Sequence, residues 1–430
     1  MTDPVAIALD ELTRLHPKKI DLGLERIERV LAKLGNPHLN LPPTVHIAGT
    51  NGKGSTVAFL RAMAEAEGLK AHVYTSPHLV HFRERIVVAS EQIDDDKLVD
   101  VLTRVREANG DEPLSFFEAT TAAAFLAFSE TPADICIIEV GLGGRYDATN
   151  VLDMPAVVGI TPIALDHAEF LGRDIAGIAR EKAGIFKFNG VGFQGPQTDL
   201  VEAVIEAEAN KMNLHLSQWG RDFRAYKQTG GLVYETENEV MDLPAPGLLG
   251  DHQYMNAGLA IALARYMQIS RDAIAKGLET VSWPARMQNL TTGPLAEKVA
   301  KIGGELWLDG GHNPHAATAI AAVIADLESR QTRPLVLITG MLANKDVGGV
   351  LDHYAGLAAH LIAVDIPGHA SLAAETLAEL ATSRNLSSYM ADDLDDAIEL
   401  ALKLGEEKTA PRILICGSLY LSGVVLAENG

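Results

Sequence analysis

The stretch that decides the fold is "VHIAGTNGKGST", which runs from Val45 to Thr56. It begins as a strand-like run, continues as a glycine-rich loop around Lys53, and ends in a Ser-Thr pair at the start of a helical pattern. Loop N–H groups, a helix N-terminus and a lysine together form a cradle for phosphate. The stretch therefore predicts a phosphate-binding loop, although Gly49-x-x-Gly52-Lys53-Gly54-Ser55 departs from the standard Walker A spacing. A plain glycine-rich turn between strand and helix is the alternative.

Outward from this loop, short β-branched runs alternate with amphipathic helical patterns. The strand candidates are "TVHIAG" (44–49), "AHVYTS" (71–76), "ADICIIEVG" (133–141), "AVVGITPI" (156–163) and "GVGFQ" (190–194). Helices are expected over about 54–67 and 253–267. The alternation is typical of a mostly parallel sheet. In contrast, "FRAYKQTGGLVYET" (223–236) predicts a hairpin that turns at Gly230-Gly231 and forms an antiparallel edge.

A second alternation begins after "VSWPARMQ" (281–288). Its strand candidates are "ELWLDGG" (305–311), "PLVLITG" (334–340), "HLIAVDI" (360–366), "SSYMA" (387–391) and "RILICGS" (412–418). A chain of 430 residues is also longer than one hydrophobic core usually supports. We therefore predict an N-terminal α/β domain over 1–285 and a smaller C-terminal α/β domain over 286–430.

The composition narrows the class of partner. A net charge of −21 argues against general nucleic-acid binding, which needs a basic face, but it leaves room for a small phosphate site. The N-terminal residues "MTDPVAIALDELTRL" have neither a basic start nor a long apolar run, so we expect no signal peptide, no membrane span and a cytoplasmic location. Cys136 and Cys416 lie in apolar strand-like runs and are expected to be buried free thiols.

Polar residues follow several predicted strands. In "TSPHLVHFRERI" (75–86), Ser76 stands at a strand end, where open α/β sheets bind ligands, although a plain Ser-Pro turn is the simpler interpretation. In "IIEVGLGGRYDATN" (137–150), Glu139 is a carboxylate inside an apolar strand. A buried carboxylate needs a cation or several donors, so a metal ion and a neighbouring arginine are both open.

The same arrangement recurs further along the chain. Asp166 and His167 come just after the strand of "GITPIALDHAEFLG" (159–172), and "REKAGIFK" (180–187) contains Lys182, which is otherwise an ordinary surface lysine. In the second half, "LDGGHNPHA" (308–316) places Asp309 and His312 between a strand and a helix. Helix capping by the following Asn-Pro pair alone does not require Asp309 or His312.

Taken together, these segments resemble the folylpolyglutamate synthase family in its bacterial form that also carries dihydrofolate synthase activity. The shared motifs are "GTNGKGS", "TSPHL", "EVGLGGRYDATN", "LDH", "EKAGI", "HQ..NA", "WP.R.Q", "LDGGHNP.A" and "CGSLYL.G", in the family's order. The wider resemblance is to the Mur ligases of cell-wall synthesis. It implies an N-terminal P-loop ATPase domain joined to a C-terminal Rossmann-like domain on the glutamate side, with the active site in the cleft.

The resemblance also implies roles for individual residues. Phosphate and ATP contacts would come from Gly52, Lys53, Gly54, Ser55, Asn256, Arg286 and Asp309. Magnesium, as two ions, would be held by Ser76, Glu139, His167 and a carbamylated Lys182. Lys182, His312 and Asp309 would be catalytic, with His312 near the transferred phosphate. The pteroate pocket would be lined by Asp21, Leu22, Gly23, Phe116, Phe117, Glu118 and Asp147.

The expected reaction is ATP-dependent addition of L-glutamate to dihydropteroate and to folates, through an acyl phosphate. Plain core packing explains the two phenylalanines equally well, so a folylpolyglutamate synthase without the dihydropteroate activity stays open. A different Mur-type ligase would keep the phosphate loop but lack "IDLGLERI" (20–27). A nucleotide-binding regulator would not need Glu139, His167, Asp309 and His312 together. The expected protein is a monomer that acts on small molecules.

Overall fold

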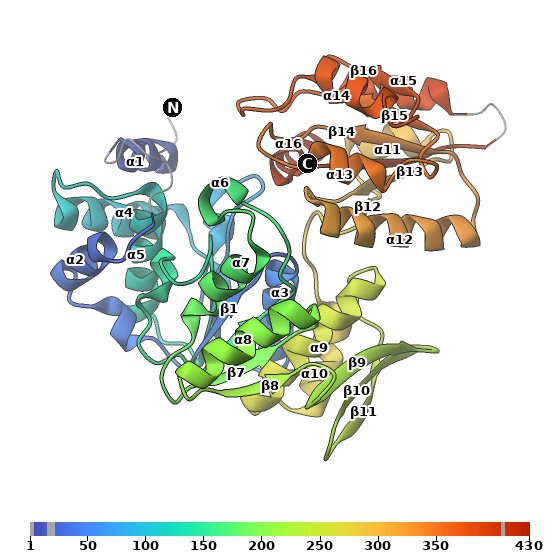
Figure 1. Ribbon diagram of the computed structural model, residues 1–430. Coiled ribbons are helices and arrows are strands. Elements are labelled where there is room, and N and C mark those ends of the chain that lie inside the picture. The colour runs from blue at the N-terminus through green and yellow to red at the C-terminus, as the bar shows by residue number, and fades with distance from the viewer. Residues whose placement is uncertain (1–3, 15–21, 406–408) are drawn as a thin grey trace. The chain divides into compact units, whose positions relative to one another are not determined.

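The computed structural model describes residues 4–14, 22–405 and 409–430. It contains two compact units, one formed by Met1–Gly247 and Tyr254–Val281 and the other by Leu248–Gln253 and Ser282–Gly430. Each unit is built on a sheet with mainly parallel strand pairs and flanking helices (Figure 1). The predicted α/β class is therefore confirmed. The division of functional roles between 1–285 and 286–430 stays a prediction.

An eight-stranded sheet forms the centre of the larger unit, in the order β4-β3-β2-β5-β1-β6-β7-β8. Its strands are β1 (Thr44–Ala48), β2 (Ala71–Tyr74), β3 (Ile86–Val88), β4 (Glu91–Gln92), β5 (Ile135–Glu139), β6 (Val157–Ile160), β7 (Val191–Gln194) and β8 (His215–Gln218). Only the pairs that include β3 or β4 are antiparallel. Of these strands, β1, β2, β5, β6 and β7 were predicted from the sequence. The very short β3 and β4 were missed, and so was β8, whose four residues lack a β-branched run.

Helices cover both faces of this sheet. They are α1 (Pro4–Thr13), α2 (Glu25–Lys33), α3 (Lys53–Ala66), α4 (Asp95–Asn109), α5 (Phe116–Ser129), α6 (Ala168–Leu171), α7 (Ile175–Lys182), α8 (Asp199–Lys211), α9 (Asp251–Tyr266) and α10 (Arg271–Thr280). One face, which carries Ile138 and Val158, packs on α5, α7 and α8. On the other face, Gly159 lies against Leu263 of α9, and α3 packs beside it. Such coverage explains why β1, β5 and β6 are buried on both sides.

The predicted hairpin is present, but two of its details were wrong. β9 (Phe223–Gln228) and β10 (Gly231–Thr236) pair with Gln228 opposite Gly231, so the two-residue turn is Thr229-Gly230 rather than Gly230-Gly231. Gly230, the second residue of the turn, has a φ of +85°, a conformation that glycine adopts without strain. The hairpin also does not extend the main sheet, because it pairs with β11 (Val240–Pro244) in a three-stranded sheet of its own.

The smaller unit contains a six-stranded sheet in the order β12-β13-β17-β14-β15-β16. The strands are β12 (Gln288–Leu290), β13 (Glu305–Leu308), β14 (Leu335–Thr339), β15 (His360–Ala363), β16 (Ser388–Met390) and β17 (Arg412–Cys416). Its helices are α11 (Pro294–Ala300), α12 (Pro314–Arg330), α13 (Val347–Asp352), α14 (Ala374–Thr382), α15 (Leu394–Leu404) and α16 (Leu419–Asn429). The five predicted strands are all present. The short antiparallel β12 was missed, and it begins just after the expected domain boundary between residues 285 and 286.

Four single-turn helices complete the element list: η1 (Pro37–Asn40), η2 (Phe82–Arg85), η3 (Ala148–Val151) and η4 (Ala183–Ile185). Cys136 and Cys416 are free and buried, as predicted. Within the described residues, every helix is too short or too polar to cross a membrane.

Candidate active site

The glycine loop joins the carboxyl end of β1 to the first turn of α3 and leaves no room for larger side chains. Gly49 has a φ of +149° and Gly52 one of +87°. A methyl group on Gly49 would overlap the Thr161 hydroxyl, and one on Gly52 would overlap the side-chain amide of Asn256. Asn256, on α9, is buried and lies directly against the loop. The two glycines are thus required both by backbone conformation and by close neighbours.

The segment that follows β6 holds the loop in place. The N–H groups of Thr50 and Asn51 both donate to the carbonyl of Pro162, at 3.0 and 3.2 Å. The Thr50 hydroxyl donates to the carbonyl of Ala164 and accepts from its N–H group. These bonds fix the loop before any ligand arrives, which is the property that a phosphate cradle needs.

Two lysine amines converge on one carbonyl of the loop. Lys53 Nζ donates to the Gly49 carbonyl at 3.2 Å, and Lys182 Nζ donates to the same oxygen at 2.8 Å. Lys182 ends α7 and is 5% exposed, so the surface interpretation is wrong. Burial, helped by the charge of Lys53, lowers the pKa of Lys182 to about 7, although Asp166 opposes this shift. A substantial fraction of the amine is therefore uncharged at neutral pH.

Ser76 and Glu139 meet at the carboxyl ends of the adjacent parallel strands β2 and β5. Ser76 N donates to Glu139 Oε2 at 3.3 Å. Glu139 is buried and pairs in register with Ile47 on β1, two residues before the loop. A carboxylate and a hydroxyl supply the hard oxygen atoms that Mg²⁺ prefers, and Mg²⁺ sites commonly use one or two carboxylates and complete their shell with phosphates and water. These residues fit such an ion.

His167 lies past the end of β6, which is separated from β5 by β1. It has a left-handed φ of +52° and precedes α6, and its side chain is 40% exposed. Its Nε2 is 4.0 Å from Asp166 Oδ2. Across the part of the chain that the structure describes, no three His, Cys, Asp or Glu side chains are arranged to hold a metal ion by themselves. Any ion here would need further oxygen ligands, such as hydroxyl groups, water, a substrate or a modified side chain.

The predicted pteroate wall is built on the first turn of α5. Phe117 lies tilted against Tyr74, with 6.1 Å between ring centroids, and over Gly141, where a methyl group would overlap its ring. Phe116 packs edge-on against Phe82 at 5.9 Å. Both phenylalanines are only partly buried against the core. They can therefore serve as core and also present apolar surface to a flat ligand.

Glu118 is already occupied by neighbouring groups. Its carboxylate accepts from the N–H group of Ser115 at 2.7 Å in a capping box, and from Arg26 Nε at 3.1 Å. Arg26 follows Leu22 and Gly23, so Glu118 anchors the end of the "IDLGLERI" segment to α5. Asp21 lies outside the described residues.

Asp147 is buried in the loop after β5. It accepts from Leu142 N at 2.8 Å and from Thr149 N at 3.0 Å. Burial raises the pKa of Asp147, while these donors oppose that shift. The carboxylate therefore shapes the loop that follows Glu139, in addition to any contact with a ligand.

The smaller unit has its own cluster at the carboxyl end of β13. Asp309 accepts from Met287 N at 2.8 Å and from Gly311 N at 2.7 Å. Arg286 Nη1 donates to the carbonyl of Ala285, which also accepts from Gly310 N. Burial raises the pKa of Asp309, and the charge of Arg286 opposes this.

The neighbouring residues of this cluster start a helix. His312 Nδ1 is 3.1 Å from the carbonyl of Gly310. Asn313 caps α12 by accepting from Ala316 N, with a proline in the first turn, as predicted. The structure thus brings Arg286, Asp309 and His312 together at one strand end of this unit.

One charged residue beside the site was passed over by the sequence analysis. Arg85 ends the loop that begins at Ser76, and its carbonyl accepts from Thr75 N at 2.9 Å. Its Nε donates to His78 Nδ1 at 2.8 Å, and its guanidinium lies 5.2 Å from the centroid of the Phe82 ring. The signal in the sequence was that Arg85 is a basic residue directly before the apolar strand β3.

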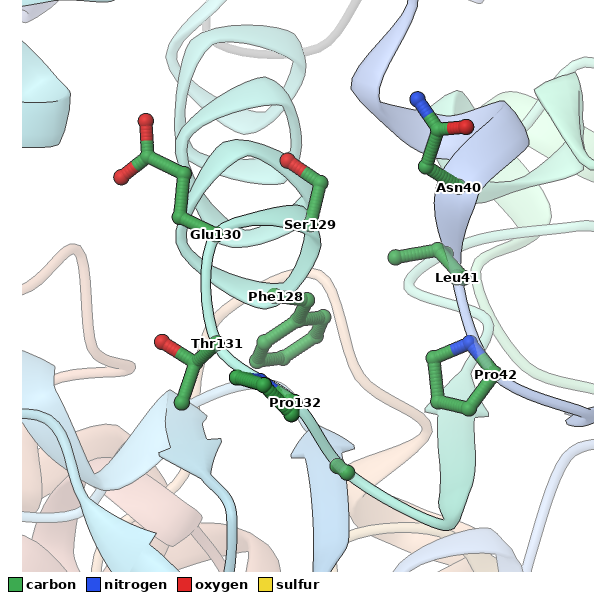
Figure 2. Close-up of a pocket in the computed structure, with 9 residues that line it drawn as sticks. Asn40, Leu41, Pro42, Phe128, Ser129, Glu130, Thr131 and Pro132 are labelled. Atoms are coloured by element: carbon green, nitrogen blue, oxygen red, sulfur yellow. The ribbon is translucent and has the colours of Figure 1, made fainter.

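A hollow of about 330 Å³ lies elsewhere on the larger unit (Figure 2). Its lining includes Pro42 and Pro132, which precede β1 and β5. It therefore opens at the amino ends of these strands. The glycine loop, Ser76 and Glu139 all lie at the carboxyl ends, where parallel α/β sheets bind ligands.

Comparison with known protein families gives two matches. The Mur ligase middle domain matches residues 47–264, and the Mur ligase glutamate ligase domain matches residues 296–419. The first match contains the glycine loop, Ser76, Glu139, His167 and Lys182. The second contains Asp309 and His312.

Curated relatives match over most of the chain. The dihydrofolate synthase/folylpolyglutamate synthase of Escherichia coli is 33% identical over 97% of this chain and 93% of its own length. A probable bifunctional folylpolyglutamate synthase/dihydropteroate synthase of Halobacterium salinarum is 35% identical over 81% of this chain. The matched region spans only 42% of that longer protein.

Solved structures of similar proteins share the fold. Escherichia coli FolC in complex with DHPP and ADP superimposes with a TM-score of 0.89 at 31% identity, and covers 99% of this chain and 97% of its own. The bifunctional folylpolyglutamate synthase/dihydrofolate synthase of Yersinia pestis, complexed with AMPPNP and Mn ion, gives a TM-score of 0.87 at 30% identity, with 99% and 98% coverage.

Proposed function

Because the chain belongs to the Mur ligase family, among the dihydrofolate synthase/folylpolyglutamate synthases, we propose that it adds L-glutamate to both dihydropteroate and tetrahydrofolate. It is an ATP-dependent ligase of this type. We propose the two carboxylic acids that it accepts, an acyl phosphate as the intermediate, and the residues that take part. It assigns the P-loop ATPase role to the larger unit and a Rossmann-like, glutamate-side role to the smaller one.

The observation that carries the proposal is the convergence of Lys53 and Lys182 on the Gly49 carbonyl, at 3.2 and 2.8 Å. Two amines on one phosphate loop are more than a nucleotide-binding turn requires. A ligase that activates a carboxylic acid must bring the acid's negative charge up to the γ-phosphate of ATP. Lys53 supplies positive charge at the loop, which reduces that repulsion. Lys182, whose pKa is lowered to about 7, stands beside it as an amine that can be carbamylated.

The proposed chemistry has two steps. The acid's carboxylate oxygen attacks the γ-phosphorus, which gives an acyl phosphate and ADP. The amine of L-glutamate then attacks the acyl carbon, an amide forms, and inorganic phosphate leaves. Lys53, the loop N–H groups and the N-terminus of α3 hold the phosphates in this scheme. Asn256 would contact adenine, while Arg286, Asp309 and His312 would contact ATP and the transferred phosphoryl group.

Glu139 and Ser76 are the proposed ligands of one divalent ion, and His167 with a carbamylated Lys182 of a second. Such ions, when bound, neutralise charge on phosphate and acyl-phosphate oxygens. A carbamate needs an uncharged amine, and the lowered pKa of Lys182 supplies one near neutral pH. The carbamate would replace the ammonium, which carries donors only, by two oxygen acceptors.

The test is release of phosphate from ATP in the presence of Mg²⁺ and L-glutamate, with one acid added at a time. Dihydropteroate and tetrahydrofolate should each stimulate release and yield a glutamylated product identified by mass spectrometry. Release with tetrahydrofolate alone would reduce the activity to folylpolyglutamate synthase. Release only with a UDP-muramyl acid would overturn the proposal in favour of another Mur-type ligase.

A further inference from the structure

The loop that leaves β2 at Thr75 returns to the same place with Arg85. Thr75 N donates to the Arg85 carbonyl at 2.9 Å. Tyr74, which precedes Thr75, and Ile86, which follows Arg85, are antiparallel partners on β2 and β3. Ser76 follows Thr75 directly, and its N–H group donates to Glu139. Arg85 therefore enters the sheet at the edge where the proposed magnesium ligands lie.

Its guanidinium lies among the aromatic side chains of that edge. It is 5.2 Å from the Phe82 ring centroid, and Phe82 in turn packs edge-on against Phe116 at 5.9 Å. The charge of Arg85 also acts on Tyr74, whose pKa is raised by burial and partly lowered again by this guanidinium. Tyr74 contacts Phe117. The side chain thus stands between the apolar wall and the strand ends.

Neighbouring groups also fix the orientation of Arg85. Its Nε donates to His78 Nδ1 at 2.8 Å, and its guanidinium carbon lies over the Phe82 ring. The turn that carries Phe82 is itself held by Glu84, whose carboxylate accepts from Leu79 N and Val80 N at 2.7 and 2.9 Å. A fixed guanidinium suits planar, two-point recognition of a carboxylate, which a lysine does not provide.

We infer that Arg85 is a substrate-binding residue that receives the carboxylate of the acid before activation. The inference rests on the proposed function, in which dihydropteroate is one of the two acids. Apolar rings on one side would hold the flat part of the molecule. The guanidinium would hold the charged end beside Ser76 and Glu139. Arginine stays charged at every working pH, so this attraction persists in a chain whose net charge is −21.

The inference predicts that the protein prefers a ligand with a carboxylate over the same ligand with a neutral amide, and that Arg85 causes this preference. Equilibrium binding is measured for dihydropteroate and for its neutral carboxamide, in wild type and in Arg85→Gln. Wild type should bind the carboxylate about 10- to 100-fold more tightly than the amide, the range expected for a charge-assisted contact. Arg85→Gln should lose that preference and bind both ligands with similar affinity. Its KM for ATP should stay within about threefold of wild type.

Arg83→Gln is the matched control, because Arg83 lies two residues away and is exposed near Asp95. It should keep the full preference. Arg85→Lys covers the case in which Arg85→Gln does not fold. It retains the charge without the planar fork and should keep only part of the preference. If folded Arg85→Gln or Arg85→Lys kept all of it, the inference would be overturned while the proposed function stood. A wild type that binds neither ligand would overturn both.

Discussion

The side-chain amine of Lys182, the last residue of α7, donates a 2.8 Å hydrogen bond to the main-chain carbonyl of Gly49, the first residue of the glycine loop. Lys53 reaches the same oxygen. Two cationic side chains beside one carbonyl repel each other, and the less exposed one loses its proton more easily. The pair thus couples the phosphate loop to the state of Lys182.

The first prediction concerns carbamylation of Lys182. Because burial lowers its pKa to about 7, the neutral amine predominates above that pH rather than above 10.5. At a fixed concentration of dissolved ¹³CO₂ and saturating Mg²⁺, a carbamate ¹³C resonance should grow as pH rises through about 7. The Lys182→Ala variant should lack this resonance and be inactive, and millimolar formate or acetate should partly restore its activity. Lys276→Ala, at an exposed position on α10, should keep the resonance. Growth only near pH 10 would contradict the assignment.

The second prediction concerns the charge that faces the phosphates. Lys53→Ala removes one amine from the loop but leaves the turn and its bonds to Pro162 in place. Turnover should fall by about 10²–10³, as for other lost contacts to transition-state charge. Steady-state phosphate release measures this. A fall of only a few-fold would exclude the loop as the ATP site.

The third prediction separates a metal role for Glu139 from a structural one. Glu139→Gln keeps an oxygen that accepts the N–H group of Ser76 and removes the negative charge. We expect little change in the free energy of unfolding, because a buried amide costs less than a buried anion. Activity should be lost, or recovered only at much higher Mg²⁺. An unchanged Mg²⁺ titration would mean that the carboxylate serves the fold alone.

The fourth prediction uses two glycines at opposite ends of α3. Gly52 and Gly68 have nearly equal φ values of +87° and +86°, but only Gly52 has neighbours within 4 Å, in Asn256. Both alanine variants should lose about 1–2 kcal/mol of unfolding free energy from backbone strain. Gly52→Ala should in addition lose ATP binding, since the methyl group displaces Asn256. Urea unfolding and the KM for ATP measure the two effects. Normal ATP binding by Gly52→Ala would contradict the close-packed loop.

Much of the fold could be predicted because its signals are local. Runs of about five mostly apolar residues that include valine or isoleucine predict strands wherever they lie, so β1, β5 and β17 were found. The strands β3, β4, β8, β11 and β12 were missed, because they are short or polar and become strands only through pairing with a neighbour. The hairpin turn was misplaced by one residue because two adjacent glycines, Gly230 and Gly231, satisfy the same local rule.

The candidate site divides in the same way. The sequence by itself determined the glycine loop between a strand and a helix, because strand, glycines, Lys53 and helix are contiguous and need no distant partner; its phosphate-binding role stays a prediction. It also marked Glu139, since a carboxylate within an apolar run requires compensation. Only the tertiary structure decided that Lys182 is buried against Gly49, 133 residues away. Likewise, only the tertiary structure decided that Glu118 is held by Arg26. Burial and ion pairing depend on which distant segments the sheet order places side by side, and no local pattern encodes that order.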